Sequence, residues 1–200
     1  MRLMRPSRQG AAAVPDDAPP DAELWARGDE HAFGELYDRY AEAVWNHAYR
    51  LTASWSTAED LTSATFLTAW RRRAEMTLVR DSALPWLFTV AGNLARSEFR
   101  RKARLSRLLR RVPRNDVQRD HADEVASSVD HETKLRQVLR AVERLPRAER
   151  EAVELVLLGE LSVAEAAEAL GVAEVSVRSR ISRARTRLRK ALADDSLEVQ

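Results

Sequence analysis

Arginine recurs at almost every second position between residues 178 and 190. This segment holds six arginines and one lysine, and it contains no acidic residue. A guanidinium presents a planar fork of N–H donors that can hold a phosphate, or the edge of a guanine, with two hydrogen bonds at once. The chemistry that this segment predicts is therefore the recognition of nucleic acid.

Two short helices joined by a tight turn are expected to position these arginines. Ser162 and Glu165 have the spacing of a capping box, which predicts the start of a helix. Gly171 suits the left-handed residue that ends a helix. The apolar stripe of the second helix alternates with the arginines and consists of Val177, Ile181, Ala184, Leu188 and Leu192. This pattern is typical of a helix-turn-helix, whose second helix lies in the major groove of DNA.

The alternative is a solvated arginine face, because arginine is common throughout this chain. The capped first helix, the glycine turn and the acid-poor second helix occur together, and this combination favours DNA binding. A second basic block lies between residues 96 and 114, with nine basic residues and one acid. The formal net charge is only +2, so the distribution of charge is more informative than its sum.

Several classes of function find no support in the sequence. There is no cysteine, which excludes disulfides and thiolate metal sites, and the four histidines form no pair at metal-ligand spacing. We find no catalytic triad, no paired acid and base carboxylates and no phosphate-binding glycine loop. The sequence therefore predicts a protein that is not an enzyme and needs no cofactor or metal. Without a secretory signal or a membrane-length apolar run, we expect it to be cytoplasmic.

The hydrophobic periodicity predicts an all-α fold with two small helical domains joined by a flexible linker. Helices are expected near residues 30–51 and 58–73, the second starting at Ser56 or Thr57, and another begins near Pro85. The Leu145–Pro146 step predicts a break before a helix over residues 147–158. The predicted organisation is a disordered tail (1–20), a first domain (21–104), a linker (105–130) and a second domain with the helix-turn-helix (131–193).

Four motifs in order resemble the sigma factors of bacterial RNA polymerase, in particular the small extracytoplasmic-function (ECF) group. They are GDEHAFGELYDRY from residue 28, AEDLTSATFLTAW from residue 58, LPWLFTVAGNLARSEFRR from residue 84, and the C-terminal region with LPRAEREAVEL and SVRSRISRARTRLRKAL. The resemblance covers residues 22–192 and implies a subunit that directs core polymerase to promoters and assists promoter melting and initiation.

The resemblance implies a polymerase-binding helix over residues 58–70. It would dock on the coiled-coil clamp helices of the largest polymerase subunit. Family members usually have Gln-Glu where this chain has Ser-Ala, which removes two polar side chains from the expected interface. The residues that match the family's contact positions are Asp60, Ser63, Ala64 and Phe66.

The resemblance also implies that the loop over residues 73–83 and the following helix read the minus-ten element as single-stranded DNA. Asn93 matches a family asparagine, although Gly92 replaces the arginine that usually precedes it. An amide can read a base edge, and it can also form a local hydrogen bond. The implied DNA-binding residues of this helix are Asn93, Arg96, Arg100 and Arg101.

The second domain resembles the reader of the minus-35 element, which is double-stranded promoter DNA. Its recognition helix matches the family pattern, except that Val175 replaces the usual glycine. The implied DNA-binding residues are Ser176, Arg178, Ser179, Arg180 and Arg183. Family members are often inhibited by an anti-sigma factor, which is therefore an implied partner. No apolar run in the sequence approaches the length of a membrane span, so we expect no direct membrane insertion of this chain.

Two alternatives remain open at the level of the sequence. A free-standing helix-turn-helix regulator would bind duplex DNA without polymerase, usually as a dimer on two half-sites. A protein-interaction scaffold would bind polymerase without supporting transcription, and the Ser63–Ala64 departure leaves room for it.

Overall fold

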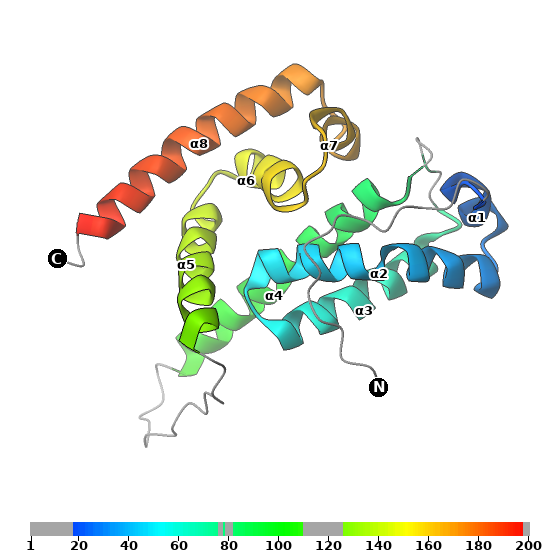
Figure 1. The fold of residues 1–200 in the computed structure, drawn as a ribbon, viewed down its shortest axis with the longest axis horizontal. Helices are drawn as coiled ribbons and strands as arrows, with labels where there is room; N and C mark the ends of the chain where they lie inside the picture. Colours follow the sequence, from blue (N-terminus) through cyan, green and yellow to red (C-terminus); the bar gives the residue numbers. More distant parts are fainter. Residues whose placement is uncertain (1–17, 76–77, 79–81, 110–125, 198–200) are drawn as a thin grey trace.

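The computed structural model describes residues 18–75, 78, 82–109 and 126–197, and over these residues it contains only helices, turns and loops (Figure 1). This confirms the predicted all-α class. The expected tail falls almost entirely on residues 1–17, which lie outside the described residues, as do residues 110–125 of the expected linker.

The first domain is a bundle of three long helices with a short helix at one end. The long helices α2, α3 and α4 pack on one another, and α1 packs on α2. Their apolar faces meet in a core that includes Leu36, Val44 and Leu87, each almost completely buried. The bounds are α1 Asp21–Arg27, α2 Glu30–Thr52, α3 Trp55–Arg72 and α4 Leu84–Leu109.

The start of α3 differs from the expected position because a different serine caps it. The side chain of Ser54 accepts a hydrogen bond from the backbone N–H of Thr57, so Ser56 lies inside the first turn. Ala53 adopts the left-handed conformation with φ of 47° and ends α2. This tight turn lets α3 begin at Trp55, three residues before the position that we predicted.

The second domain consists of α5, α6, a π-helical segment η1, α7 and α8. The predicted break at Pro146 is confirmed, since Pro146 is the N-cap of α6. The helix that we expected over residues 147–158 changes to π-helical geometry after Val153. The bounds are α5 Ala126–Glu143, α6 Arg147–Val153, η1 Glu154–Leu158, α7 Val163–Ala169 and α8 Glu174–Leu197.

The helices at the domain boundary extend into the predicted linker. The first domain ends with α4, which reaches Leu109, and the second begins with α5 at Ala126. Both helices therefore enter the range 105–130. Their additional turns continue a helical hydrogen-bond ladder, which adds one bond for each residue and does not require tertiary packing.

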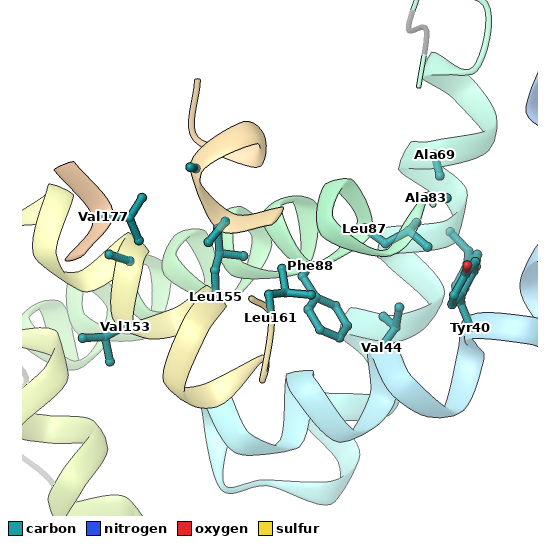
Figure 2. Close-up of a cluster of buried hydrophobic side chains, with 14 of the residues drawn as sticks. Tyr40, Val44, Ala69, Ala83, Leu87, Phe88, Val153, Leu155, Leu161 and Val177 are labelled. Atoms are coloured by element: carbon teal, nitrogen blue, oxygen red, sulfur yellow. The ribbon is translucent and has the colours of Figure 1, made fainter. Parts of the chain in front are cut away.

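The two domains dock through a shared hydrophobic cluster (Figure 2). Phe88 of α4 packs among residues of the second domain that include Leu155 and Leu161, and all three are at least 94% buried. Full burial of side chains of this size contributes about 1.5–3 kcal/mol each. The contact also needs a glycine at 159, where a Cβ atom would lie 2.9 Å from the Phe88 ring.

Polar contacts support the same docking. Arg50 of α2 donates a hydrogen bond to the carbonyl oxygen of Leu158 at 3.1 Å, and its guanidinium lies 2.9 Å from the carboxylate of Glu160. His47, one turn earlier on α2, is 1% exposed and stacks on Phe88 with the ring centroids 4.2 Å apart. Burial lowers the pKa of His47 to about 4, so this imidazole is neutral at physiological pH.

Candidate nucleic-acid interface

The helix-turn-helix is formed by α7 and α8. The side chain of Ser162 accepts a hydrogen bond from the N–H of Glu165, and the Glu165 carboxylate accepts one from the N–H of Ser162. This confirms the predicted capping box. Gly171 has φ of 63°, which the turn between the helices requires and which a residue with a Cβ adopts only with strain. In Figure 1, α8 projects away from the first domain.

The inner face of α8 anchors the helix in the second domain, and its outer face is basic. Val177, Ile181 and Ala184 are buried, as the predicted stripe requires. Among the predicted DNA-binding residues, Arg178, Ser179 and Arg183 are exposed, whereas Ser176 and Arg180 are partly buried. The arginines of the outer face are therefore available to a ligand as large as duplex DNA.

Acidic side chains orient three arginines of α8. Glu149 of α6 is buried, and its carboxylate lies 3.1 Å from Arg187 and 3.8 Å from Arg183. Arg178 forms an ion pair with Glu174 at 2.8 Å. Ion pairs at exposed positions contribute at most about 1 kcal/mol, so a DNA phosphate can replace the partner of Arg178.

The minus-ten candidates on α4 have a different environment. Arg96 donates a hydrogen bond to the side-chain oxygen of Asn93 at 2.6 Å and forms an ion pair with Glu154 of η1. The carboxylate of Glu151 of α6 lies 3.7 Å from the same guanidinium. The Arg96 side chain is only 11% exposed as a result. Acidic residues of the second domain therefore bind Arg96, a side chain that the resemblance assigns to promoter DNA.

Gly92 explains how Glu154 reaches Arg96. A Cβ atom at position 92 would lie 3.2 Å from the Glu154 carboxylate, and Gly92 itself is buried. A long side chain at this position would displace Glu154. The departure from the family pattern that we noted in the sequence is thus part of the contact between the two domains.

Arg100 and Arg101 lie beyond this contact and are exposed. Arg101 donates two hydrogen bonds to the Glu98 carboxylate, at 2.8 and 2.9 Å. These bonds hold the pKa of Glu98 below its usual value. The structure therefore brings Asn93 and Arg96 together, with Arg96 covered by the second domain, and it leaves Asn93, Arg100 and Arg101 exposed.

We expect the docking of the two domains to strengthen as the pH falls from 8 to 6. Burial raises the pKa of Glu154 from 4.5 to about 7, although Arg96 and Arg150 act in the opposite direction. When the domains separate, Glu154 is exposed and its pKa returns toward the ordinary value. The docked state then binds the proton more tightly than the open state. Between the pKa of the docked state, about 7, and the ordinary value of 4.5, each unit of decrease in pH favours docking by up to about tenfold.

Fluorescence transfer between dyes on the two domains would measure this dependence. The chain has no cysteine, so single cysteines at Gly34 and Thr186 would label specifically. The matched control is Glu154→Gln, which keeps the size of the side chain and should remove the strengthening of docking between pH 8 and 6. Burial lowers the pKa of His47 to about 4 in the docked state, and separation would return it toward the ordinary value, so below about pH 6.5 His47 opposes docking equally in both proteins. An equal pH dependence in both proteins would contradict the assignment to Glu154.

The predicted polymerase-binding residues lie on α3, but not all of them reach the surface. Asp60 and Ser63 are exposed, and Ala64 is partly buried. Phe66 is only 5% exposed, because it packs against Phe33 and Tyr37 in the core of the bundle. Phe66 therefore belongs to the core that underlies this face of α3.

Two exposed apolar side chains near this face were missed in the sequence analysis. Leu67 on α3 is 48% exposed, and Tyr37 on α2 is 45% exposed with its ring 4.7 Å from that of Phe66. Both fall outside the buried stripes of their helices. This offset from the helical period is the signal that could have identified them.

Other kinds of site find no support in the described part of the chain. Its histidine, aspartate and glutamate residues form no group of three or more that could hold a metal ion. None of the helices of residues 18–75, 82–109 and 126–197 is long and apolar enough to cross a membrane.

Two family models match the chain, one in each domain. Residues 36–105 match the model of sigma-70 region 2, and residues 135–188 match the model of sigma-70 region 4. The two regions follow one another in the order that the resemblance implied. A regulator with a single helix-turn-helix would not carry the first of them.

Two curated relatives are similar over most of the chain. The ECF RNA polymerase sigma factor BldN of Streptomyces coelicolor is 36% identical over 174 residues, which are 84% of this chain and 63% of that protein. The ECF RNA polymerase sigma factor SigL of Mycobacterium tuberculosis is 32% identical over 163 residues, which are 80% of this chain and 88% of that protein.

Two solved structures have a similar arrangement of helices. CnrH in complex with the cytosolic domain of CnrY is 27% identical, with a TM-score of 0.58, and the match covers 88% of this chain and 98% of that one. The sigma factor RpoE in complex with the anti-sigma factor NepR from Bartonella quintana is 26% identical, with a TM-score of 0.53. That match covers 80% and 96% of the two chains.

The fold and its basic surfaces define a two-domain helical DNA-binding protein with one helix-turn-helix. The domain models and the relatives make the identity more specific. The chain belongs to the ECF sigma factors of bacterial RNA polymerase, the subunits that direct core polymerase to promoters.

Proposed function

We propose that the two domains divide promoter recognition between them. The exposed face of α3 with Asp60 and Ser63 binds the clamp helices of core polymerase. The helix α4 binds the minus-ten element, which is held as a single strand after melting. The outer face of α8 reads the minus-35 element as duplex DNA. The proposed DNA-binding residues are Asn93, Arg96, Arg100 and Arg101 on α4, and Ser176, Arg178, Ser179, Arg180 and Arg183 on α8.

The observation that carries this proposal is the outward basic face of α8 on a capped helix-turn-helix. Its inner face is buried at Val177 and Ala184, which fixes the helix on the domain, and Arg178 and Arg183 are about two-thirds exposed. Side chains in this position can reach base edges and phosphates in a major groove. A solvated face alone would not call for the capped helix-turn-helix that holds these arginines outward.

The proposed use of Arg96 requires the two domains to move apart. In the docked arrangement the Arg96 guanidinium forms ion pairs with Glu151 and Glu154, where DNA phosphates would otherwise bind. Single-stranded DNA that follows α4 needs this positive charge, because a basic groove tracks the backbone of such a strand. Docking and minus-ten binding are therefore mutually exclusive at Arg96, and core polymerase would favour the separated state by binding it more tightly.

We extend the proposal to an inhibitory partner. The two similar solved structures are complexes, one with the cytosolic domain of CnrY and one with the anti-sigma factor NepR. We infer that this chain also binds a protein of the anti-sigma class. Binding of such a partner would compete with core polymerase for the surfaces of the first and second domains.

Transcription in a purified system tests the main proposal. The components are bacterial core polymerase, this protein and fragmented genomic DNA from its host, and the transcript starts are sequenced. Starts that depend on the protein and share two spaced upstream motifs would support the proposal and reveal the promoter. Absence of such starts, with the protein eluting separately from core polymerase on a sizing column, would contradict it.

We expect Asp60→Arg to weaken binding to core polymerase by roughly 30-fold. Asp60 is exposed on α3, so the change adds a positive charge to the proposed interface without altering the core. Reversed charges that face a complementary surface cost several kcal/mol, and ~2 kcal/mol corresponds to this factor. Titration of labelled protein with core polymerase measures the affinity.

The matched control makes the same change of charge on another helix. Glu23→Arg alters an exposed residue of α1, away from the proposed face, and should leave the affinity for core polymerase unchanged. Asp60→Arg should still bind upstream promoter DNA through the second domain. Equal affinities of the two variants for core polymerase would remove Asp60 from the interface.

A further inference from the structure

Val175 is the most exposed of the large hydrophobic side chains in the described part of the chain. It is 69% exposed and is the second residue of α8. It belongs to neither of the two hydrophobic clusters that the described residues form. The first turn of the recognition helix thus presents an apolar side chain to solvent, at the end that approaches base edges in a helix-turn-helix.

The helical period places Val175 on the DNA-facing side. Val177 and Ile181 point inward and are at least 93% buried. Residues three and four positions apart share a face of a helix, so Val175 lies beside Arg178 and Ser179, which are both exposed. Val175 is therefore the apolar member of a surface whose other members can donate or accept hydrogen bonds.

The stability of the fold does not account for a valine at this position. Exposed helix positions favour alanine or long unbranched side chains, and a β-branched residue has a lower helix propensity. The same branching leaves Val175 one preferred rotamer in a helix, so its methyl groups are held in place before any ligand binds. A rigid apolar contact loses little conformational entropy on binding.

We propose that Val175 contacts the 5-methyl group of a thymine in the minus-35 element and selects thymine at that position. The inference rests on the proposed function of α8. Of the four bases, only thymine carries a methyl group in the major groove, and apolar side chains are its usual partners. Arg178 and Ser179 then read or anchor neighbouring positions through hydrogen bonds, and Val175 adds a contact that requires no polar group.

Replacement of single thymines by uracil tests the proposal, because uracil lacks only the methyl group. The test uses the complex of core polymerase with the full chain and a promoter fragment found in the transcription experiment. Each thymine of the minus-35 element is replaced in turn, and the affinity is measured for the wild type and for Val175→Ala. At one position, uracil should weaken binding of the wild type by about fourfold, which corresponds to one buried methyl-sized group.

The variant should lose this discrimination at that position and keep any discrimination at the others. Thr186→Ala is the matched control, since it truncates another exposed β-branched residue of α8 further from its N-terminus. It should respond to uracil as the wild type does. Val175→Ala is expected to fold, because Val175 packs in neither cluster, and thermal unfolding checks this.

Three results would overturn the proposal. The minus-35 element could contain no thymine, the wild type could bind all uracil substitutions equally well, or Val175→Ala could retain the full response. A loss of affinity in Val175→Ala that is the same for thymine and uracil would indicate a contact with the sugar instead. Failure of the proposed function has a separate signature, in which the complex with core polymerase forms at no promoter at all, and the Val175 proposal then falls with it.

Discussion

Replacing Arg178 and Arg183 together with alanine is expected to lower the affinity of the polymerase complex for its promoter on the order of 100-fold, because each arginine contact with a base contributes about 1–3 kcal/mol. Both side chains are at least 60% exposed on the outer face of α8. The fold should tolerate the change. Arg187 remains 3.1 Å from Glu149, so this buried carboxylate keeps a cationic partner in the variant.

The salt dependence of binding separates the two kinds of contact. Each lost phosphate contact reduces the slope of log affinity against log salt by about 0.9, whereas lost base contacts change specificity. Lysine at the same two positions is the matched control. It keeps the charge but lacks the planar fork that binds a guanine edge or a phosphate with two hydrogen bonds.

Filter binding or fluorescence anisotropy over a range of potassium chloride concentrations provides the measurement. If Arg178 and Arg183 contact phosphates, the lysine variant should keep the wild-type slope. If they read bases, both variants should bind less selectively, whereas only lost phosphate contacts should lower the slope of the alanine variant. Wild-type affinity and slope in the alanine variant would remove both residues from the proposed interface.

Reversing the charge of Glu154 is expected to separate the two domains. Glu154→Arg would place a second guanidinium against Arg96 in a contact where both side chains are about nine-tenths buried. Like charges placed side by side at a buried contact cost several kcal/mol. The docked population should therefore fall by at least a hundredfold relative to the open one.

The exchange of both charges distinguishes lost docking from misfolding. Arg96→Glu combined with Glu154→Arg restores an ion pair of opposite polarity, so the domains should dock again. The exchanged protein still lacks the cation that we assign to minus-ten DNA. It should therefore dock well and open promoters poorly, whereas Glu154→Arg alone keeps Arg96 and should open promoters at least as well as the wild type.

Fluorescence transfer between cysteines at Gly34 and Thr186 reports the docking of all these variants. Arg101→Glu is the matched control, because Arg101 is exposed and pairs with Glu98 of its own helix. It should leave the transfer efficiency unchanged. Unchanged transfer in Glu154→Arg would show that the apolar contacts around Phe88 hold the domains together without the ion pair.

Local sequence signals predicted the parts of the fold that depend on neighbouring residues. The capping box of Ser162 and Glu165, the left-handed Gly171 and the break at Pro146 are all present. Each of them involves backbone groups only a few positions apart. The start of α3 shows the limit of such signals, since three nearby residues could each cap a helix and the turn at Ala53 favours Ser54.

The candidate sites were predicted unevenly for the same reason. The exposed arginines of α8 follow from helical period alone, because the buried stripe of the helix determines its outer face. Phe66 is different. The family pattern assigns it to the polymerase interface, but its aromatic ring packs against Phe33 and Tyr37 from another helix. Whether an apolar residue of a helix is buried or exposed depends on the helices that pack around it.

The sequence by itself thus determined the all-helical class, the helix-turn-helix and the family, because these depend on local spacing and on the order of motifs. Only the tertiary structure decided that Arg96 faces Glu154, 58 positions along the chain, and that Gly92 and Gly159 allow this approach. Contacts between residues so far apart arise from the docking of two domains. Helical periodicity contains no information about which partner a basic side chain will meet across such an interface.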